Sequence, residues 1–242
     1  MQTNVTPAHL RLEIELRSQL GPGVAVVCTG VDGDPNDLWP EEFVAIARAI
    51  PRRQREFAAG RAAARAAMRL LQRPDKPVPS QPDRSPSWPE DLVGSIAHTT
   101  DVCIAVLGAR DQWESIGIDV EPDTGIEESL WDTIFNPHEE IELLGQSQAM
   151  RASHAKRMFV AKESFYKWYY PQKKEMLDFH SVTVKWGADG SNFLAMVKDP
   201  VSPASVANCT GHVFSSEGTL VAYCATKVAT RPTSTVPHFF PS

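Results

Sequence analysis

The order of helical and extended segments is the feature that most constrains the fold of this chain. Each half of the sequence has helical patterns followed by short apolar runs typical of strands. The clearest helix is the alanine-rich stretch 52–72, which Pro74 ends. Helical patterns cover residues 8–20, 40–50, 52–72, 126–150 and 153–170, and strand patterns cover 24–28, 102–107, 115–120, 182–186, 193–197 and 220–224. Helices and strands segregated in this way favour the α+β class.

The length of 242 residues suits one large domain or two small ones, and 42% hydrophobic residues are enough to build a core. We expect an N-terminal α+β half at 1–115, a C-terminal α+β half at 116–228 and a flexible tail at 229–242. Six prolines between Pro74 and Pro89 predict an irregular extended loop that is able to wrap around a ligand.

The beginning of the chain shows no pattern of secretion or membrane insertion. It lacks a basic segment followed by an apolar one, and no run in the sequence reaches the roughly 18 apolar residues that a membrane span needs. The four cysteines (Cys28, Cys103, Cys209 and Cys224) are far apart, which argues against a disulfide framework or a zinc site. We therefore expect a cytoplasmic protein with no stable membrane insertion.

Charge is distributed unevenly along the chain. The net charge of −6 argues against a general nucleic-acid binder, so no nucleic-acid partner is expected. Residues 52–73 carry seven arginines against one acid, whereas residues 111–150 carry eleven acids and no lysine or arginine. A single ligand that suits both regions would bring phosphates to the first and a bridging cation to the second. The alternative is that both regions are ordinary solvated faces.

Two carboxylates end a predicted strand in the segment 117–122, Gly-Ile-Asp-Val-Glu-Pro. Asp119 and Glu121 are two residues apart, so on a strand their side chains project to the same side. Paired carboxylates suit Mg²⁺, which binds one or two of them and completes its octahedron with water and substrate phosphates. The alternative is a polar strand end that leads into a turn.

A further acidic position lies in the segment 159–167, Phe-Val-Ala-Lys-Glu-Ser-Phe-Tyr-Lys, inside a helix that Pro171 is expected to end. Glu163 and Lys167 are four residues apart, hence on one helix face, where an ordinary surface ion pair contributes about 0.3–0.5 kcal/mol. Lys162 adds a second cation, so the segment begins to resemble a platform for phosphates and a metal. The ammonium of Lys167 is expected to lower the pKa of Glu163.

His98 follows the proline-rich loop in the segment 94–99, Gly-Ser-Ile-Ala-His-Thr. From this position its ring is able to reach a phosphate, although a single histidine is more often structural. Ser95 is not followed by the glycine that a hydrolase nucleophile elbow requires. The sequence also contains neither of the common glycine-rich phosphate loops.

Taken in order, four segments resemble the 4′-phosphopantetheinyl transferases of the surfactin and enterobactin synthetase type. The first runs from Arg53 to the Phe-Ala-Ala-Gly-Arg sequence at 57–61, and the second consists of Trp88-Pro89 followed by Gly-Ser-Ile-Ala-His at 94–98. The third is Gly-Ile-Asp-Val-Glu at 117–121, and the fourth is the segment 159–167. Each segment alone is a weak signature, whereas four in the family's order and approximate spacing are a strong one. The resemblance covers about residues 50–170.

The resemblance implies a pseudo-twofold pair of similar α+β halves with coenzyme A in the cleft between them. It also implies that a serine hydroxyl of an apo-carrier protein attacks the β-phosphorus of coenzyme A, giving holo-carrier and adenosine 3′,5′-bisphosphate. Phosphoryl transfer of this kind needs positioning and charge neutralisation more than covalent chemistry. Because the segment from Trp88 to His98 looks closest to the enterobactin type, we expect the carrier to be a peptidyl or aryl carrier domain of a siderophore-like or other secondary pathway, such as nonribosomal peptide synthesis. We also expect a monomeric enzyme.

The resemblance also implies roles for individual residues, which fall into a metal site and a coenzyme site. The triad that holds Mg²⁺ in the family is matched by Asp119, Glu121 and Glu163. The positions that bind the coenzyme phosphates are matched by Arg53, Arg61 and His98. The lysines that neutralise the pyrophosphate are matched by Lys162 and Lys167. Asp119, Glu163 and Lys167 form the expected catalytic group, with Glu163 both a metal ligand and the base for the serine proton. Relatives of the enterobactin type often carry a lysine in the loop before the Trp-Pro pair, where this chain has Ser-Gln-Pro-Asp-Arg at 80–84. Arg84 is expected to replace that coenzyme contact, with a planar fork of different geometry.

Two other functions use the same residues. A metal-dependent phosphohydrolase acting on a nucleotide-like pyrophosphate would activate water with these acids, and it would release free phosphopantetheine without a carrier protein. A non-catalytic module that binds carrier proteins would have no need for all three acids.

Overall fold

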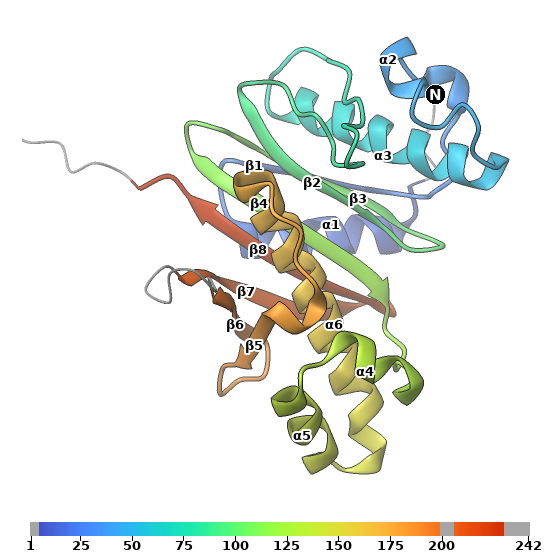
Figure 1. Cartoon of the computed structure of the whole chain (residues 1–242). Helices are drawn as coiled ribbons and strands as arrows, with labels where there is room; N and C mark the ends of the chain where they lie inside the picture. The colour runs from blue at the N-terminus through green and yellow to red at the C-terminus, as the bar shows by residue number, and fades with distance from the viewer. Residues whose placement is uncertain (1–4, 199–205, 230–242) are drawn as a thin grey trace, which may run out of the picture.

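The chain folds into two antiparallel sheets, each with a long helix packed against one face (Figure 1). This computed structural model describes residues 5–198 and 206–229, so the predicted tail at 229–242 lies outside the described residues apart from Ala229. Helices and strands are both abundant and the strands pair antiparallel throughout, which confirms the α+β class.

The first half is built on a sheet with the strand order β1-β3-β2. Its elements are α1 (Pro7–Leu20), β1 (Val24–Thr29), η1 (Pro35–Asp37), α2 (Pro40–Phe43), α3 (Pro51–Leu70), β2 (Leu92–His98) and β3 (Cys103–Ala109). Alternate strand residues face opposite sides of the sheet. Val24 and Val26 therefore pack toward leucines of α1, while Ala25 packs toward the alanines of α3. The predicted helix 52–72 is confirmed as α3.

The second half is built on a sheet with the strand order β4-β8-β7-β6-β5. Its elements are β4 (Trp113–Pro122), η2 (Glu128–Leu130), α4 (Trp131–Ile134), α5 (Pro137–Gly145), α6 (Gln148–Lys173), η3 (Phe179–Ser181), β5 (Val182–Trp186), β6 (Asn192–Lys198), β7 (Val206–Ser216) and β8 (Thr219–Lys227). The apolar face of α6 packs on this sheet through residues such as Val160 and Phe165. The hydrophobic effect thus fixes α6 across β4 and β8.

Gly117 allows α6 to lie directly against β4. A Cβ atom at this position would overlap the carbonyl oxygen of Ser164 and the backbone nitrogen of Trp168, so no larger residue fits. The hydroxyl of Ser115 also donates to the Trp168 carbonyl at 2.7 Å. This close approach places the polar face of α6 over the end of β4 that carries Asp119.

Each half contains a buried carboxylate that ties a short helix to the long one. In the first half Glu42 of α2 accepts from Arg65 of α3 at 2.9 Å, and in the second half Glu139 of α5 accepts from Lys162 of α6 at 2.6 Å. Both carboxylates are at most 2% exposed. Both also accept backbone N–H groups, those of Trp39 and Val78 in the first half and those of Asn136 and Val184 in the second. This correspondence fits a pseudo-twofold pair of halves.

The two halves meet where edge strand β2 lies beside edge strand β4. The hydroxyl of Ser95 on β2 accepts the backbone N–H of Ile118 on β4 at 3.1 Å. The predicted division between residues 115 and 116 falls inside β4, and the limits of the halves stay a prediction.

Several elements differ from the sequence prediction. The helical stretch expected at 126–150 was predicted to be interrupted at Pro137, and α5 does begin at that residue. The part before Pro137 is further divided into η2 and α4, and α6 already begins at Gln148. Strands β2 and β7 were not predicted, because polar or glycine residues interrupt their apolar runs. These residues are Gly94 and Ser95 in β2, and Thr210 and Gly211 in β7. Pairing with neighbouring strands stabilises both in spite of their weak patterns.

Pro171 does not end α6, which continues to Lys173. A proline has no N–H to donate to the carbonyl four residues before it, so Pro171 removes one hydrogen bond of the last turn, and only two more residues continue the helix. The helix ends at Lys174, which adopts the left-handed conformation with a φ of 57° and donates its N–H to the Tyr170 carbonyl at 2.8 Å.

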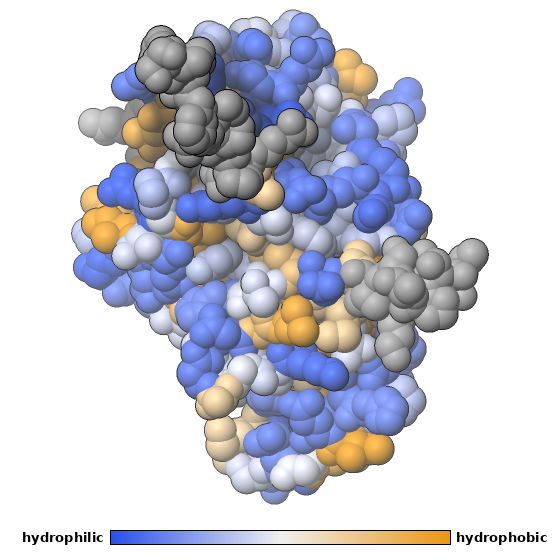
Figure 2. Space-filling view, turned by 90° about the vertical axis from the view of Figure 1, so that its left-hand side faces the viewer, coloured by the Kyte–Doolittle hydropathy of each residue, from blue (hydrophilic) through white to orange (hydrophobic). Residues whose placement is uncertain are grey.

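The surface is polar with separate apolar patches. On the face shown in Figure 2, hydrophobic side chains lie in small groups among polar ones. Among the helices of residues 5–198 and 206–229, none is long and apolar enough to cross a membrane.

Candidate functional site

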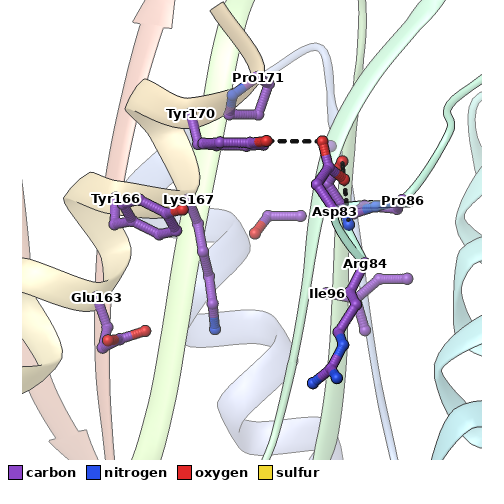
Figure 3. Close-up of a pocket in the computed structure, with 12 residues that line it drawn as sticks. Asp83, Arg84, Pro86, Ile96, Glu163, Tyr166, Lys167, Tyr170 and Pro171 are labelled. Atoms are coloured by element: carbon purple, nitrogen blue, oxygen red, sulfur yellow. Dashed lines mark hydrogen bonds between the residues drawn. The ribbon is translucent and has the colours of Figure 1, made fainter. Parts of the chain in front are cut away.

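A groove runs along the junction between the halves. It consists of three adjoining cavities: one beside α2, one in the middle that His98 lines, and one at the other end beside α6. Arg84 lines all three. Arg53 and Arg61 line the α2 cavity and the middle one, and Lys167 lines the middle one and the α6 cavity. The cavity beside α2 has a volume of about 680 Å³, within the usual size of a small-molecule site. The cavity at the other end has Glu163, Lys167 and Tyr170 of α6 on one wall and the loop with Asp83 and Arg84 on the other (Figure 3).

His98 ends β2 beside the first turns of α3, where its ring contacts Arg53. The distance from Arg53 Nη1 to His98 Nε2 is 2.8 Å, and His98 Nδ1 lies 3.3 Å from the Thr99 carbonyl oxygen. An arginine only donates, so Nε2 is the acceptor and Nδ1 carries the proton. Burial lowers the pKa of His98, the Thr99 hydrogen bond opposes this, and the cations Arg53 and Lys167 lower it further. The ring is therefore neutral near pH 7.

Arg61 forms the floor of the groove and also anchors the proline-rich loop. Its Nε donates to the Val78 carbonyl at 2.8 Å and its Nη2 donates to Ser80 Oγ at 3.2 Å. Its guanidinium stacks on the Phe57 ring, 3.8 Å from the centroid. Burial, opposed by Glu42, lowers the pKa of Arg61 to about 10, so the side chain stays charged at neutral pH.

Asp119 and Glu121 project from β4 toward α6, as expected for alternate residues of a strand. Each carboxylate is paired with a lysine of α6. Lys167 Nζ lies 2.6 Å from Asp119 Oδ1, and Lys156 Nζ lies 3.1 Å from Glu121 Oε2. Burial would lower the pKa of Lys167, but the neighbouring carboxylates of Asp119, Glu163 and Glu121 outweigh it and raise the pKa.

Glu163 lies on the same face of α6 as these two lysines. The expectation that its pKa is lowered is wrong for the free protein, because burial raises it to about 6. Repulsion from Asp119 and Glu121 adds to this rise, and the ammonium of Lys167 only partly offsets it. A carboxylate with a pKa near 6 suits a base that works close to neutral pH.

The three carboxylates have the donor chemistry of a Mg²⁺ site. Asp119 Oδ2 is buried and has no hydrogen-bond partner among the described residues, so a cation would satisfy it. The mutual repulsion that raises the pKa of Glu163 would also be relieved by a cation. Within residues 5–198 and 206–229, no three acidic, histidine or cysteine side chains already converge on one point as a formed metal cluster. Carboxylate oxygens are thus suitable ligands for Mg²⁺ here. In the absence of the metal, Lys167 neutralises Asp119 and Lys156 neutralises Glu121.

Lys162 does not lie in the groove, which corrects its expected role at the pyrophosphate. Its side chain is 1% exposed. Its ammonium donates to the Glu139 carboxylate at 2.6 Å and to the carbonyls of Ile134 and Phe179 at 2.9 and 2.8 Å. An ammonium has three donors, so none remains for a phosphate. The sequence motif could not reveal this, because the partners are 17 to 28 residues away.

Lys162→Met should therefore lower the free energy of unfolding by about 3–5 kcal/mol, because it leaves the Glu139 carboxylate buried and unpaired. The measurement is chemical denaturation, with calorimetry of coenzyme A binding on the folded variant. A second substitution, Glu139→Leu, should restore part of the stability. If the variant kept its stability but lost coenzyme A binding, Lys162 would instead be a residue of the coenzyme site.

Sequence reasoning missed three residues around the groove. Asp83 and Tyr170 meet across it, and Lys156 binds the Glu121 carboxylate. The spacing of Lys156, Glu163 and Lys167, seven and then four residues, places all three on one helix face and is the signal that would have found Lys156. No comparable signal links Asp83 to Tyr170, which are 87 residues apart.

Comparison with known proteins gives matches along most of the chain. Residues 39–108 match the 4′-phosphopantetheinyl transferase N-terminal domain, and residues 115–224 match the 4′-phosphopantetheinyl transferase superfamily. The chain is 34% identical to the 4′-phosphopantetheinyl transferase Svp of Streptomyces mobaraensis over 174 residues, 71% of each protein. It is 34% identical to the 4′-phosphopantetheinyl transferase PptT of Mycobacterium tuberculosis over 163 residues, 66% of this chain and 71% of that protein. It is 33% identical to enterobactin synthase component D of Escherichia coli over 135 residues, 54% of this chain and 61% of that protein.

Proposed function

The chain belongs to the 4′-phosphopantetheinyl transferase superfamily, and we infer from this that it moves 4′-phosphopantetheine from coenzyme A to a serine of an apo-carrier protein. The serine oxygen forms a bond to the β-phosphorus, and the bond from that phosphorus to the oxygen bridging the two phosphates breaks. The products are holo-carrier and adenosine 3′,5′-bisphosphate. No finding favours the alternative phosphohydrolase.

One observation supports a coenzyme site at the junction, namely a basic groove that ends at three carboxylates. Arg53, Arg61, Arg84 and Lys167 line adjoining cavities of this groove. Glu163 lines the same cavity as Lys167, and Asp119 is paired with that lysine. Anionic phosphates fit the arginine end and a divalent cation fits the acidic end. The site therefore lies between the proposed halves 1–115 and 116–228.

The residues of α3 and β2 would bind the phosphates of coenzyme A. Arg53 is half-exposed and directed at His98, so both side chains can reach one anion. Arg61 is fixed by the loop and the Phe57 ring, which orients its fork before the ligand arrives. Lys167 and Arg84 face the cavity nearest the carboxylates, where the pyrophosphate would lie.

Asp119, Glu121 and Glu163 are the residues that would hold Mg²⁺. When bound, Mg²⁺ would neutralise charge on the pyrophosphate as the leaving group departs. Lys167 keeps Asp119 Oδ1 occupied and so directs Oδ2 toward the ligand. Glu163 lies beside the position of the incoming hydroxyl and accepts its proton, directly or through one water.

The carrier is proposed to be a peptidyl or aryl carrier domain of a siderophore-like or other secondary pathway. The similarity to enterobactin synthase component D supports this choice. We also propose that the enzyme acts as a monomer in the cytoplasm.

The test is incubation with coenzyme A, Mg²⁺ and several purified apo-carrier proteins, followed by intact mass measurement. The expected result is the mass gain of one phosphopantetheine on a peptidyl or aryl carrier. Free phosphopantetheine released without a carrier would instead indicate a phosphohydrolase. Modification of a fatty-acid carrier alone would contradict the proposed carrier class.

Binding of coenzyme A should also make His98 take up protons near pH 7. The free ring is neutral because burial lowers its pKa, and a bound phosphate anion raises that pKa and favours the charged form. Calorimetry without Mg²⁺, in buffers of different ionisation enthalpy, measures the number of protons taken up. The uptake should disappear in His98→Gln and persist in His138→Gln, which changes an exposed histidine on α5. Equal uptake in His98→Gln and the unaltered protein would contradict a phosphate contact at His98.

A further inference from the structure

A hydrogen bond crosses the groove from one half to the other. The hydroxyl of Tyr170, near the end of α6, donates to Asp83 Oδ2 in the proline-rich loop at 2.7 Å (Figure 3). Lys174, which ends the same helix, adds an ion pair to Asp83 at 3.8 Å and a hydrogen bond to Gln81 Oε1 at 3.3 Å. The end of α6 therefore binds one short piece of the opposing loop.

That piece is a tight turn spanning residues 81–85. The Gln81 N–H donates to the Ser85 carbonyl and the Arg84 N–H donates to the Gln81 carbonyl, both at 2.8 Å. Asp83 Oδ1 accepts the Ser85 N–H at 2.8 Å and the Ser85 hydroxyl at 2.5 Å. Asp83 thus uses one oxygen to close the turn and the other to bind Tyr170.

Arg84 is the residue whose position depends on this turn. Its φ of 67° lies in the left-handed region, which is unfavourable for a residue with a side chain and persists only where the surroundings fix it. Its side chain lines all three cavities of the groove. Arg84 forms no ion pair with a described residue, so its guanidinium is available to a ligand.

The same contacts also keep a negative charge away from the ligand. Hydrogen bonds from Ser85 and Tyr170 lower the pKa of Asp83 to about 2, so this carboxylate is ionised at neutral pH. An unpaired anion at the edge of a phosphate-binding groove would repel the ligand. Tyr170 and Lys174 bind this carboxylate on the side of α6.

We propose that Tyr170 and Asp83 are positioning residues: their hydrogen bond across the junction fixes the turn 81–85 and so orients Arg84 toward the phosphates of coenzyme A. The proposal rests on the proposed coenzyme site, and it explains how Arg84 serves as a phosphate contact from an exposed loop. It also couples coenzyme binding to the relative placement of the two halves.

The first test is Tyr170→Phe, which removes the donor and keeps the ring that packs on Tyr166. The dissociation constant of coenzyme A, measured by calorimetry, should rise about three- to tenfold, the effect of one lost hydrogen bond. KM for coenzyme A should rise by a similar factor, while kcat and KM for the carrier stay near their normal values. The matched control is Tyr223→Phe on β8, a partly buried tyrosine outside the groove.

A double-mutant cycle then tests whether the effect acts through Arg84. Arg84→Ala should weaken coenzyme binding, and adding Tyr170→Phe to it should weaken binding no further. Asp83→Ala should resemble Tyr170→Phe, whereas Asp83→Asn should bind coenzyme A nearly normally, because its amide can still bond to Ser85 and to the Tyr170 hydroxyl.

Each contrary outcome has a distinct meaning. Additive losses in the double variant, or normal coenzyme affinity in Tyr170→Phe, would overturn the positioning role. A rise in KM for the carrier alone would place Tyr170 in carrier docking and also overturn it. If the unaltered protein bound no coenzyme A, the proposed function would be contradicted. That outcome is distinguishable from failure of the positioning role, which concerns the variants only.

Discussion

In Glu163→Gln, the rate constant for transfer should fall by roughly 10²–10⁴-fold, the usual contribution of a general base. The amide has nearly the same shape but does not accept the serine proton. Binding of coenzyme A with Mg²⁺ should weaken much less, because Asp119 and Glu121 remain. Single-turnover transfer measures the rate, and calorimetry measures binding. Glu128→Gln, an exposed glutamate in η2, is the matched control and should behave normally.

Two results would contradict this double role. Binding that falls as far as the rate would make Glu163 chiefly a metal ligand. A rate that survives in the Gln variant would assign the proton to another group or to bulk water.

The pH dependence gives an independent check on Glu163. Its pKa in the free protein is about 6, raised by burial and by the neighbouring acids. A base is active when ionised, so kcat/KM at limiting Mg²⁺ should rise with pH through about 6 and level off above it. This rise of kcat/KM with pH should be absent in Glu163→Gln. The raised pKa also stabilises the protonated protein below about pH 4.5, and this stabilisation is lost as the pH rises through about 6.

Asp119→Asn should reduce transfer by roughly 10²–10³-fold, a loss typical of removing one electrostatic contact to a developing charge. Lys167 donates to Asp119 Oδ1 and would therefore orient the amide oxygen toward itself. The amide nitrogen then occupies the position of Oδ2 and repels a cation. The measurement is the Mg²⁺ dependence of transfer, together with the thermal stabilisation by coenzyme A at increasing Mg²⁺.

A neighbouring residue provides the control for Asp119. Asp123→Asn removes a carboxylate from the loop after β4, where Asp123 accepts from the Ser215 hydroxyl. It should retain the normal Mg²⁺ response. Normal turnover of Asp119→Asn at limiting Mg²⁺ would refute the metal site.

The parts of the site that sequence could predict depend on local geometry. Asp119 and Glu121 face the same side because alternate strand residues do so. The arginines of α3 share a helix because alanine propensity and Pro74 define its extent. In both cases the spacing along the chain already determines the direction of the side chains.

The parts that sequence could not predict depend on contacts between distant segments. Lys162 and Lys167 belong to one motif, yet the partner of Lys162 is Glu139 on α5 and the partner of Lys167 is Asp119 on β4. The pKa of Glu163 has the opposite shift from the expected one, because burial against β4 outweighs a neighbour four residues away. Burial is a property of the assembled protein, and the helix pattern contains no measure of it.

The matched pairs Glu42 with Arg65 and Glu139 with Lys162 are the pattern that duplication of one ancestral unit would leave. Each half has the same internal support, but the first carries the arginines of α3 and the second the acids of β4. An ancestor with a single unit would have had to form the groove between two separate chains. Two such copies joined in one chain would be free to diverge, so that one would supply the arginines for the phosphates and the other the carboxylates of the proposed site.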